Sequence, residues 1–153
     1  MKNTALHVIV ISLFLFACSK SKDAKLISKG TAQVIEVGNH EFIIEADVFR
    51  DMSGSVGDDS LQSIVRLIDR NGNALAGLFS LRSQRLLQGP DTWNTPFDSL
   101  LDASHITYLE AISYGGPLWE IGSKVEVICT FQDLETKESY EILASAVTVF
   151  EKK

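Results

Sequence analysis

Four aspartates in one short stretch of the chain have the chemistry of calcium ligands. Asp51, Asp58 and Asp59 flank a segment rich in glycine and serine, residues 53–57, and Asp47 lies just before it. Calcium binds several carboxylate and carbonyl oxygens at once, and loops at the end of a β domain can supply them. The alternative is a solvated acidic loop without a ligand. The sequence favours the solvated loop, so we expect no metal and no cofactor.

Two aromatic side chains have the surroundings of a binding site. Trp93 lies in residues 89–96, where two prolines predict a stiff loop. Rigid, exposed aromatic rings are frequent contacts for sugars and for protein partners. Tyr114, beside two glycines, is a weaker candidate of the same kind. The alternative for Trp93 is that its ring folds back and covers the hydrophobic core.

Motifs for catalysis are missing from the sequence. His40 and His105 lack metal-ligand spacing with each other and with any cysteine. There is no Gly-x-Ser-x-Gly turn and no glycine loop of the kind that binds phosphate. A pair of carboxylates brought together by folding stays open as an alternative. We therefore expect a protein that binds and does not catalyse.

The two cysteines, Cys18 and Cys129, have different surroundings. Cys129 falls at an apolar position of an alternating segment, which predicts a buried and inert side chain. Cys18 is preceded by a positively charged N-terminal region, which contains Lys2, and by an apolar run at residues 8–17. As a helix this run covers about half of the hydrocarbon core of a membrane. This is the length of the hydrophobic region of a signal peptide, and it is too short for a membrane span.

The residues around Cys18 resemble the lipobox of bacterial lipoproteins. Leu15, Phe16, Ala17 and Cys18 place an aliphatic residue three positions before the cysteine and a small residue directly before it. The resemblance implies that residues 1–17 are a cleaved signal peptide and that lipid is attached to Cys18. Two or three acyl chains hold a protein durably to a membrane. An ordinary secretory signal with a chance cysteine is the alternative.

The segment after the signal peptide indicates the position in the cell envelope. Residues 18–24 are polar and charged, which predicts a flexible tether. Ser19 is not the aspartate of an inner-membrane retention signal, so the resemblance implies the outer membrane. The same residues are similar to a surface-export tag, and both a surface-exposed and a periplasm-facing position stay open. The net charge of −6 and the absence of a basic stripe argue against nucleic acid as a partner.

From residue 25 onward the dominant hydrophobic period is two, which is typical of β-strands. The clearest segments are residues 31–37, 42–49, 106–112, 125–131 and 140–150. They predict one all-β domain at residues 25–153, an antiparallel β-sandwich of about seven or eight strands. The last two strands are similar to the closing hairpin of immunoglobulin-like domains, and this resemblance implies the same sandwich architecture.

Three connections are predicted to be hairpins, at residues 38–39, 71–72 and 133–137. Asn-Gly, at residues 71–72, is the strongest short signal because both central residues of a type I′ turn need a positive φ. The chain around this turn also begins like a calcium loop, but the glutamate that such a loop requires is absent.

Two segments have helical features. Residues 61–68 have helical spacing of apolar side chains, but they lead into the predicted turn at residues 71–72, so we expect a strand. Residues 95–101 contain a proline at a typical first helical position, and we expect one short helical segment there.

The lipobox and a scaffold without catalytic motifs predict a membrane-anchored lipoprotein at the outer membrane or cell surface. It is expected to bind a protein or glycan through loops at one end of the domain, because loops on a rigid scaffold commonly carry binding residues. Two alternatives stay open. One is a periplasm-facing structural or assembly factor of an envelope complex, and the other is a small inhibitor or immunity lipoprotein.

Overall fold

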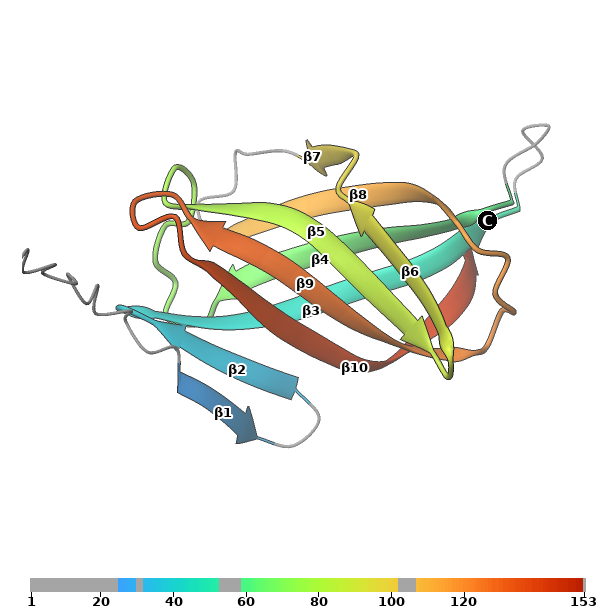
Figure 1. The fold of residues 1–153 in the computed structure, drawn as a ribbon, viewed down its shortest axis with the longest axis horizontal. Helices are drawn as coiled ribbons and strands as arrows, with labels where there is room; N and C mark the ends of the chain where they lie inside the picture. Colours follow the sequence, from blue (N-terminus) through green and yellow to red (C-terminus); the bar gives the residue numbers. More distant parts are fainter. Residues whose placement is uncertain (1–24, 30–31, 53–58, 102–106, 153) are drawn as a thin grey trace, which may run out of the picture.

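The computed structural model describes residues 25–29, 32–52, 59–101 and 107–152, which form ten β-strands (Figure 1). The strands are β1 (Lys25–Lys29), β2 (Ala32–Val37), β3 (His40–Asp51), β4 (Leu61–Asp69), β5 (Phe79–Gln88), β6 (Asp91–Pro96), β7 (Ser99–Leu101), β8 (Tyr108–Gly116), β9 (Lys124–Asp133) and β10 (Ser139–Lys152). The predicted all-β class is confirmed. This part of the chain has no helix, and hence none that could cross a lipid bilayer.

All ten strands belong to one strongly curled sheet. The order along the sheet is β6-β5-β9-β10-β2-β3-β4-β8-β7, and β1 pairs with β2. Strand pairs are antiparallel except for β3 and β10, which run parallel from the Val149–Val48 pair to the Lys152–Asp51 pair. The structure therefore differs from the predicted immunoglobulin-like, antiparallel sandwich. Alternation along each strand identified its buried face, but one sheet that curls over itself buries those faces as well as two stacked sheets do.

The sheet is mixed because β10 changes its partner halfway along its length. Ala144 pairs with Ala32 of β2, whereas the residues from Val149 onward pair with β3. Between these points the register with β9 shifts, and Ala146 has a positive φ of 57°. An extra residue in one strand forms a bulge that bends and twists that strand. The bulge thus turns β10 from β2 towards β3.

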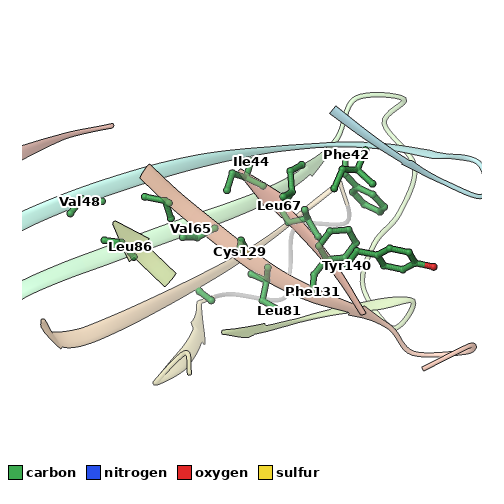
Figure 2. Packing of buried hydrophobic residues seen from close by; sticks show 14 of the residues in the cluster. Phe42, Ile44, Val48, Val65, Leu67, Leu81, Leu86, Cys129, Phe131 and Tyr140 are labelled. Atoms are coloured by element: carbon green, nitrogen blue, oxygen red, sulfur yellow. The ribbon is translucent and has the colours of Figure 1, made fainter. Parts of the chain in front are cut away.

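The core fills the concave side of the curled sheet. Val65, Leu86 and Cys129 are fully buried in its middle (Figure 2). Towards one end, the ring of Phe131 lies 4.9 Å from the ring of Phe42 and 5.5 Å from that of Tyr140, measured between centroids. Burial of one large apolar side chain contributes about 1.5–3 kcal/mol, so this cluster is a main source of stability.

Two of the three predicted hairpins are confirmed, and the third is wrong. Residues 38–39 join β2 to β3, and residues 134–138 join β9 to β10. The Asn-Gly turn at residues 71–72 does not make a hairpin, because β4 pairs with β3 and β8 while β5 pairs with β6 and β9. The buried carboxylate of Asp69 accepts a hydrogen bond from the backbone N–H of Asn71 (2.9 Å). This contact turns the chain across the end of the sheet towards its opposite wall.

The short helix predicted at residues 95–101 is also wrong. The segment contains the end of β6 and the whole of β7. Between the two strands, Phe97 donates its backbone N–H to the Arg82 carbonyl (3.4 Å), and Asp98 donates its own to the Ile112 carbonyl (2.9 Å). The segment bridges the two edges of the curled sheet, and these long-range bonds outweigh the local helical preference. Residues 61–68 form a strand, as predicted.

The curled sheet has two ends, which lie at opposite sides of Figure 1. The His40 end contains the β2–β3 turn, the β4–β5 connection and the β9–β10 turn. The Tyr114 end contains the β5–β6 turn, the β8–β9 connection and the last residues of β10.

Candidate functional site

A cavity of about 270 Å³ lies at the His40 end, and we refer to it as the His40 pocket. Three connections form its walls: residues 37–40 around the β2–β3 turn, residues 77–79 at the start of β5, and residues 133 and 135 at the β9–β10 turn. The backbone N–H of Leu134 donates to the Leu78 carbonyl (2.8 Å), which fixes two of these walls to each other. The pocket therefore depends on segments that are far apart in the sequence.

A histidine and a buried aspartate form the polar centre of this end. Nδ1 of His40 lies 2.8 Å from Oδ2 of Asp69, whose side chain is fully buried. The other carboxylate oxygen of Asp69 accepts the backbone N–H groups of Asn71 (2.9 Å) and Glu41 (3.3 Å). A buried carboxylate with this many donors is well satisfied, so it holds the imidazole in one orientation.

Asp69 carries a negative charge at neutral pH. Burial alone raises the pKa of its carboxyl, but hydrogen bonds from Asn71, Asn73, His40 and Glu41 outweigh that effect and hold the pKa below its ordinary value of 3.8. An ionised carboxylate only accepts hydrogen bonds, so the proton between the two side chains sits on Nδ1 of His40. When the imidazole is neutral, its Nε2 is then an acceptor.

Aromatic packing fixes the plane of the His40 ring. The ring stacks on Phe42 at 5.5 Å between centroids and meets the edge of Phe79 at 4.9 Å. An imidazole oriented by a carboxylate can act as a base beside a nucleophile. The residues that line the His40 pocket include no serine, threonine, cysteine or lysine.

Trp93 and Tyr114, the two ligand-binding candidates from the sequence, lie near the Tyr114 end in different surroundings. Trp93 is part of β6 rather than of a loop, is half-buried and packs against the core. Its ring lies against the backbone of Gly116, where an added Cβ would be 2.8 Å away. This placement favours the alternative in which Trp93 covers the core. Tyr114, in β8, is 46% exposed and available for contacts.

The aspartates of the weaker calcium hypothesis are only partly described. Asp59 is exposed and forms an ion pair with Arg50 at 3.1 Å. Asp51 is half-buried at the end of β3, and Asp58 lies outside the described residues. Among the residues that are described, no group of three or more histidine, cysteine, aspartate or glutamate side chains could hold a metal ion.

Of the two cysteines, Cys129 lies in the described part of the chain. Cys129 is fully buried in β9, as alternation predicted, and this burial raises the pKa of its thiol. The thiol is therefore protonated and unreactive in the folded protein. Cys18, the signal peptide at residues 1–17 and the tether at residues 18–24 lie outside the described part of the chain.

Exposed apolar side chains gather at the Tyr114 end. Seven large apolar side chains are exposed in the described residues, and five of them lie here: Met52, Tyr114, Leu118, Ile121 and Phe150. Three of the five fall in residues 114–121, at the β8–β9 connection, and Leu118 is the most exposed at 64%. Clustered exposed apolar groups commonly mark surfaces that contact another molecule.

The pairing of His40 with Asp69 was not predicted from the sequence. A weak signal was present, because His40 and Asp69 both continue the inward-facing positions of apolar strands. No protein-family model, curated protein or solved structure matches this chain. Function is therefore inferred from the geometry of the chain and from the residues around Cys18.

Proposed function

We propose that this chain is a lipid-anchored, non-catalytic binding module of the bacterial outer membrane, and that it contacts a protein partner through residues 114–121. The exposed apolar cluster at the Tyr114 end carries the proposal. Tyr114, Leu118 and Ile121 are the kind of side chains that form the centre of protein interfaces. The lipobox resemblance at residues 15–18 supports the anchor.

The position of β1 indicates which end of the curled sheet would lie near the membrane. Lys25 pairs with Glu36, next to the β2–β3 turn, so β1 begins at the His40 end. Cys18 and Lys25 are seven positions apart, and a fully extended chain of that length spans at most about 25 Å. A lipid on Cys18 would thus keep the His40 end near the membrane.

The same geometry directs the apolar cluster away from the lipid. β3 runs from one end of the curled sheet to the other, and its 12 residues correspond to about 40 Å. The Tyr114 end would then lie away from the bilayer surface in which the lipid is inserted. Its exposed apolar side chains are placed to meet another protein.

Site-specific photo-crosslinking in cells that make this protein tests the contact surface. A photoreactive residue at Leu118 is expected to give one discrete protein adduct, and Tyr114→Lys is expected to abolish it. Ala76 is exposed at the opposite end and serves as the matched control position. Equal labelling at Leu118 and Ala76, or no adduct at Leu118, would contradict the proposed surface.

Lipid attachment and orientation need separate tests. Cys18→Ser is expected to remove the lipid mass and to release the protein from the membrane fraction. A protease that cannot cross the outer membrane, applied to intact cells, separates the two orientations. Digestion with a periplasmic control intact would indicate the cell surface, and protection until lysis would favour a periplasm-facing envelope factor.

A further inference from the structure

The His40 pocket has an acidic character. Asp133 and Glu135 line it from the β9–β10 turn, and no lysine or arginine is among its lining residues. Two cations at the same end are engaged elsewhere. Lys137 donates its Nζ to the Leu134 carbonyl (2.6 Å), and Arg70 pairs with Glu41 (2.5 Å). The potential in the pocket therefore favours a positively charged guest.

The fixed imidazole adds a directed acceptor to these carboxylates. Nδ1 of His40 is bonded to Asp69, so Nε2 is the ring nitrogen that stays available to a guest. No partner of Nε2 is found within the described residues. A group that donates several hydrogen bonds and carries a positive charge matches an imidazole acceptor flanked by carboxylates.

The remaining walls and the size of the pocket limit the guest further. Val37, Leu78 and Phe79 give it an apolar side, and Leu78 is 47% exposed at its rim. The volume of about 270 Å³ lies just below the range of roughly 300–1,000 Å³ for pockets that hold drug-sized ligands. A small cation with a short hydrocarbon portion fits these walls better than a metal ion or an anion.

We propose that the His40 pocket binds a primary ammonium group on a short apolar stem. Glu135 and Nε2 of His40 receive the ammonium hydrogens, and Leu78 and Phe79 contact the stem. Two sources can supply this chemistry: a small free amine, or the ethanolamine headgroup of a phospholipid. The headgroup source alone rests on the proposed anchoring, which places this end near the membrane.

Titration of the purified protein with propylammonium, followed by NMR, tests the site. We expect saturable shifts for the His40 imidazole and for the amides of Leu78 and Phe79. Propan-1-ol has a similar size and no charge, and is expected to give no saturable shift. The proposal is overturned if propylammonium gives no saturable shift, or if the alcohol gives the same one.

Two charge-neutralising variants locate the ammonium group within the pocket. Glu135→Gln should weaken propylammonium binding about two- to fivefold, the effect of losing one exposed ion pair. Glu141→Gln removes another exposed carboxylate, which lies in β10, pairs with Arg85 of β5 at 3.6 Å and does not line the pocket. This variant should leave the affinity unchanged. Equal affinities for the wild type and Glu135→Gln would contradict the assigned position of the ammonium group.

Vesicle binding distinguishes the two sources of the amine. The unanchored Cys18→Ser protein is mixed with phosphatidylcholine vesicles that either contain or lack phosphatidylethanolamine. Binding that requires phosphatidylethanolamine and weakens in Glu135→Gln supports the headgroup, whereas saturation by propylammonium without vesicle binding supports a free amine. A chain that carries no lipid in cells would refute the anchoring and leave the propylammonium result unaffected.

Discussion

The His40 end and the Tyr114 end are formed by the same long strands, yet one buries a polar centre and the other exposes apolar side chains. At the His40 end the buried carboxylate of Asp69 is satisfied by several donors, and aromatic rings pack around its partner His40. At the Tyr114 end apolar side chains are left exposed on the β8–β9 connection. A satisfied polar centre favours a rigid pocket for a small guest, whereas exposed apolar groups favour contact with a large partner.

A second buried polar group lies in the interior of the sheet and is less well satisfied than Asp69. Gln84 of β5 is buried among apolar side chains and accepts a hydrogen bond from the Ser63 hydroxyl (2.9 Å). Its Nε2 has no hydrogen-bond partner in the described structure. An unsatisfied buried donor costs stability, in contrast to the complete network around Asp69. The comparison predicts where substitutions destabilise the protein and where they are tolerated.

The largest expected effect is the removal of a ring from the aromatic cluster of the His40 end. Phe131→Ala should lower the free energy of unfolding by about 3–5 kcal/mol, because the fully buried ring contacts Phe42 and Tyr140. Urea denaturation monitored by circular dichroism measures the change. Leu118→Ala at the Tyr114 end is the control and should stay within about 0.5 kcal/mol. Similar losses in the two variants would contradict the contrast between the ends.

The second largest loss of stability is expected when the negative charge of Asp69 is removed. Asp69→Asn keeps the shape of the side chain and should cost about 1.5–3 kcal/mol, because hydrogen bonds to a buried charged group are lost. The pKa of Asp69 is lower in the folded state, so its stabilisation is present above the ordinary value of 3.8 and disappears as the pH falls through the folded-state pKa. Unfolding followed between neutral pH and acid should show a weaker acid dependence in the variant. Glu41→Gln, at a partly exposed ion pair, is the control.

The contact between Trp93 and Gly116 gives a smaller effect at the Tyr114 end. Gly116→Ala should destabilise the protein by about 1–3 kcal/mol, because the new Cβ would lie 2.8 Å from the ring of Trp93 and from Cβ of Leu61. Part of this loss should disappear in the Trp93→Ala background, where only the Leu61 contact remains. Thermal unfolding of the two single variants and the double variant measures the coupling. Strict additivity would show that the two residues are not in contact.

The smallest effect, and one of opposite sign, is expected for the polar pair in the interior. Replacing both Gln84 and Ser63, as Gln84→Met with Ser63→Ala, should leave stability unchanged or raise it by about 1 kcal/mol, because the unsatisfied amide is removed with its partner. Ser63→Ala alone should destabilise, since it leaves the amide of Gln84 with even fewer partners. Urea midpoints of the three proteins compare these cases. A clear loss of stability in the double variant would indicate that the amide is satisfied in solution.

Several elements were predictable because their signals are local. Alternation identified the buried faces of β3 and β9, including the inward position of Cys129. The turn at residues 38–39 and the turn between β9 and β10 both joined strands that pair directly. Gly38, with a φ of 60°, supplies the backbone conformation that the first of these turns requires.

The errors arose where distant contacts overruled a local signal. The Asn-Gly turn at residues 71–72 is present as a turn. Its backbone N–H at Asn71 donates to Asp69, the Asn71 side chain donates to the Asn39 carbonyl in the β2–β3 turn, and the chain crosses to the other side of the curled sheet. The proline at residue 96 suggested a helix, but the backbone beyond it is bonded to β5 and β8. Neither partner can be identified from the residues of the segment itself.

The sequence by itself determined that the chain forms β-strands, which face of most strands is buried, and that Cys18 stands in a lipobox-like motif, since each depends on neighbouring residues. Only the tertiary structure decided the strand order, the single curled sheet and the His40–Asp69 pair. The physical reason is that a strand's pattern specifies which side chains turn inward and leaves its neighbours unspecified. His40 and Asp69 meet, 29 positions apart, because β3 and β4 pair in a register that sets Phe42 opposite Asp69.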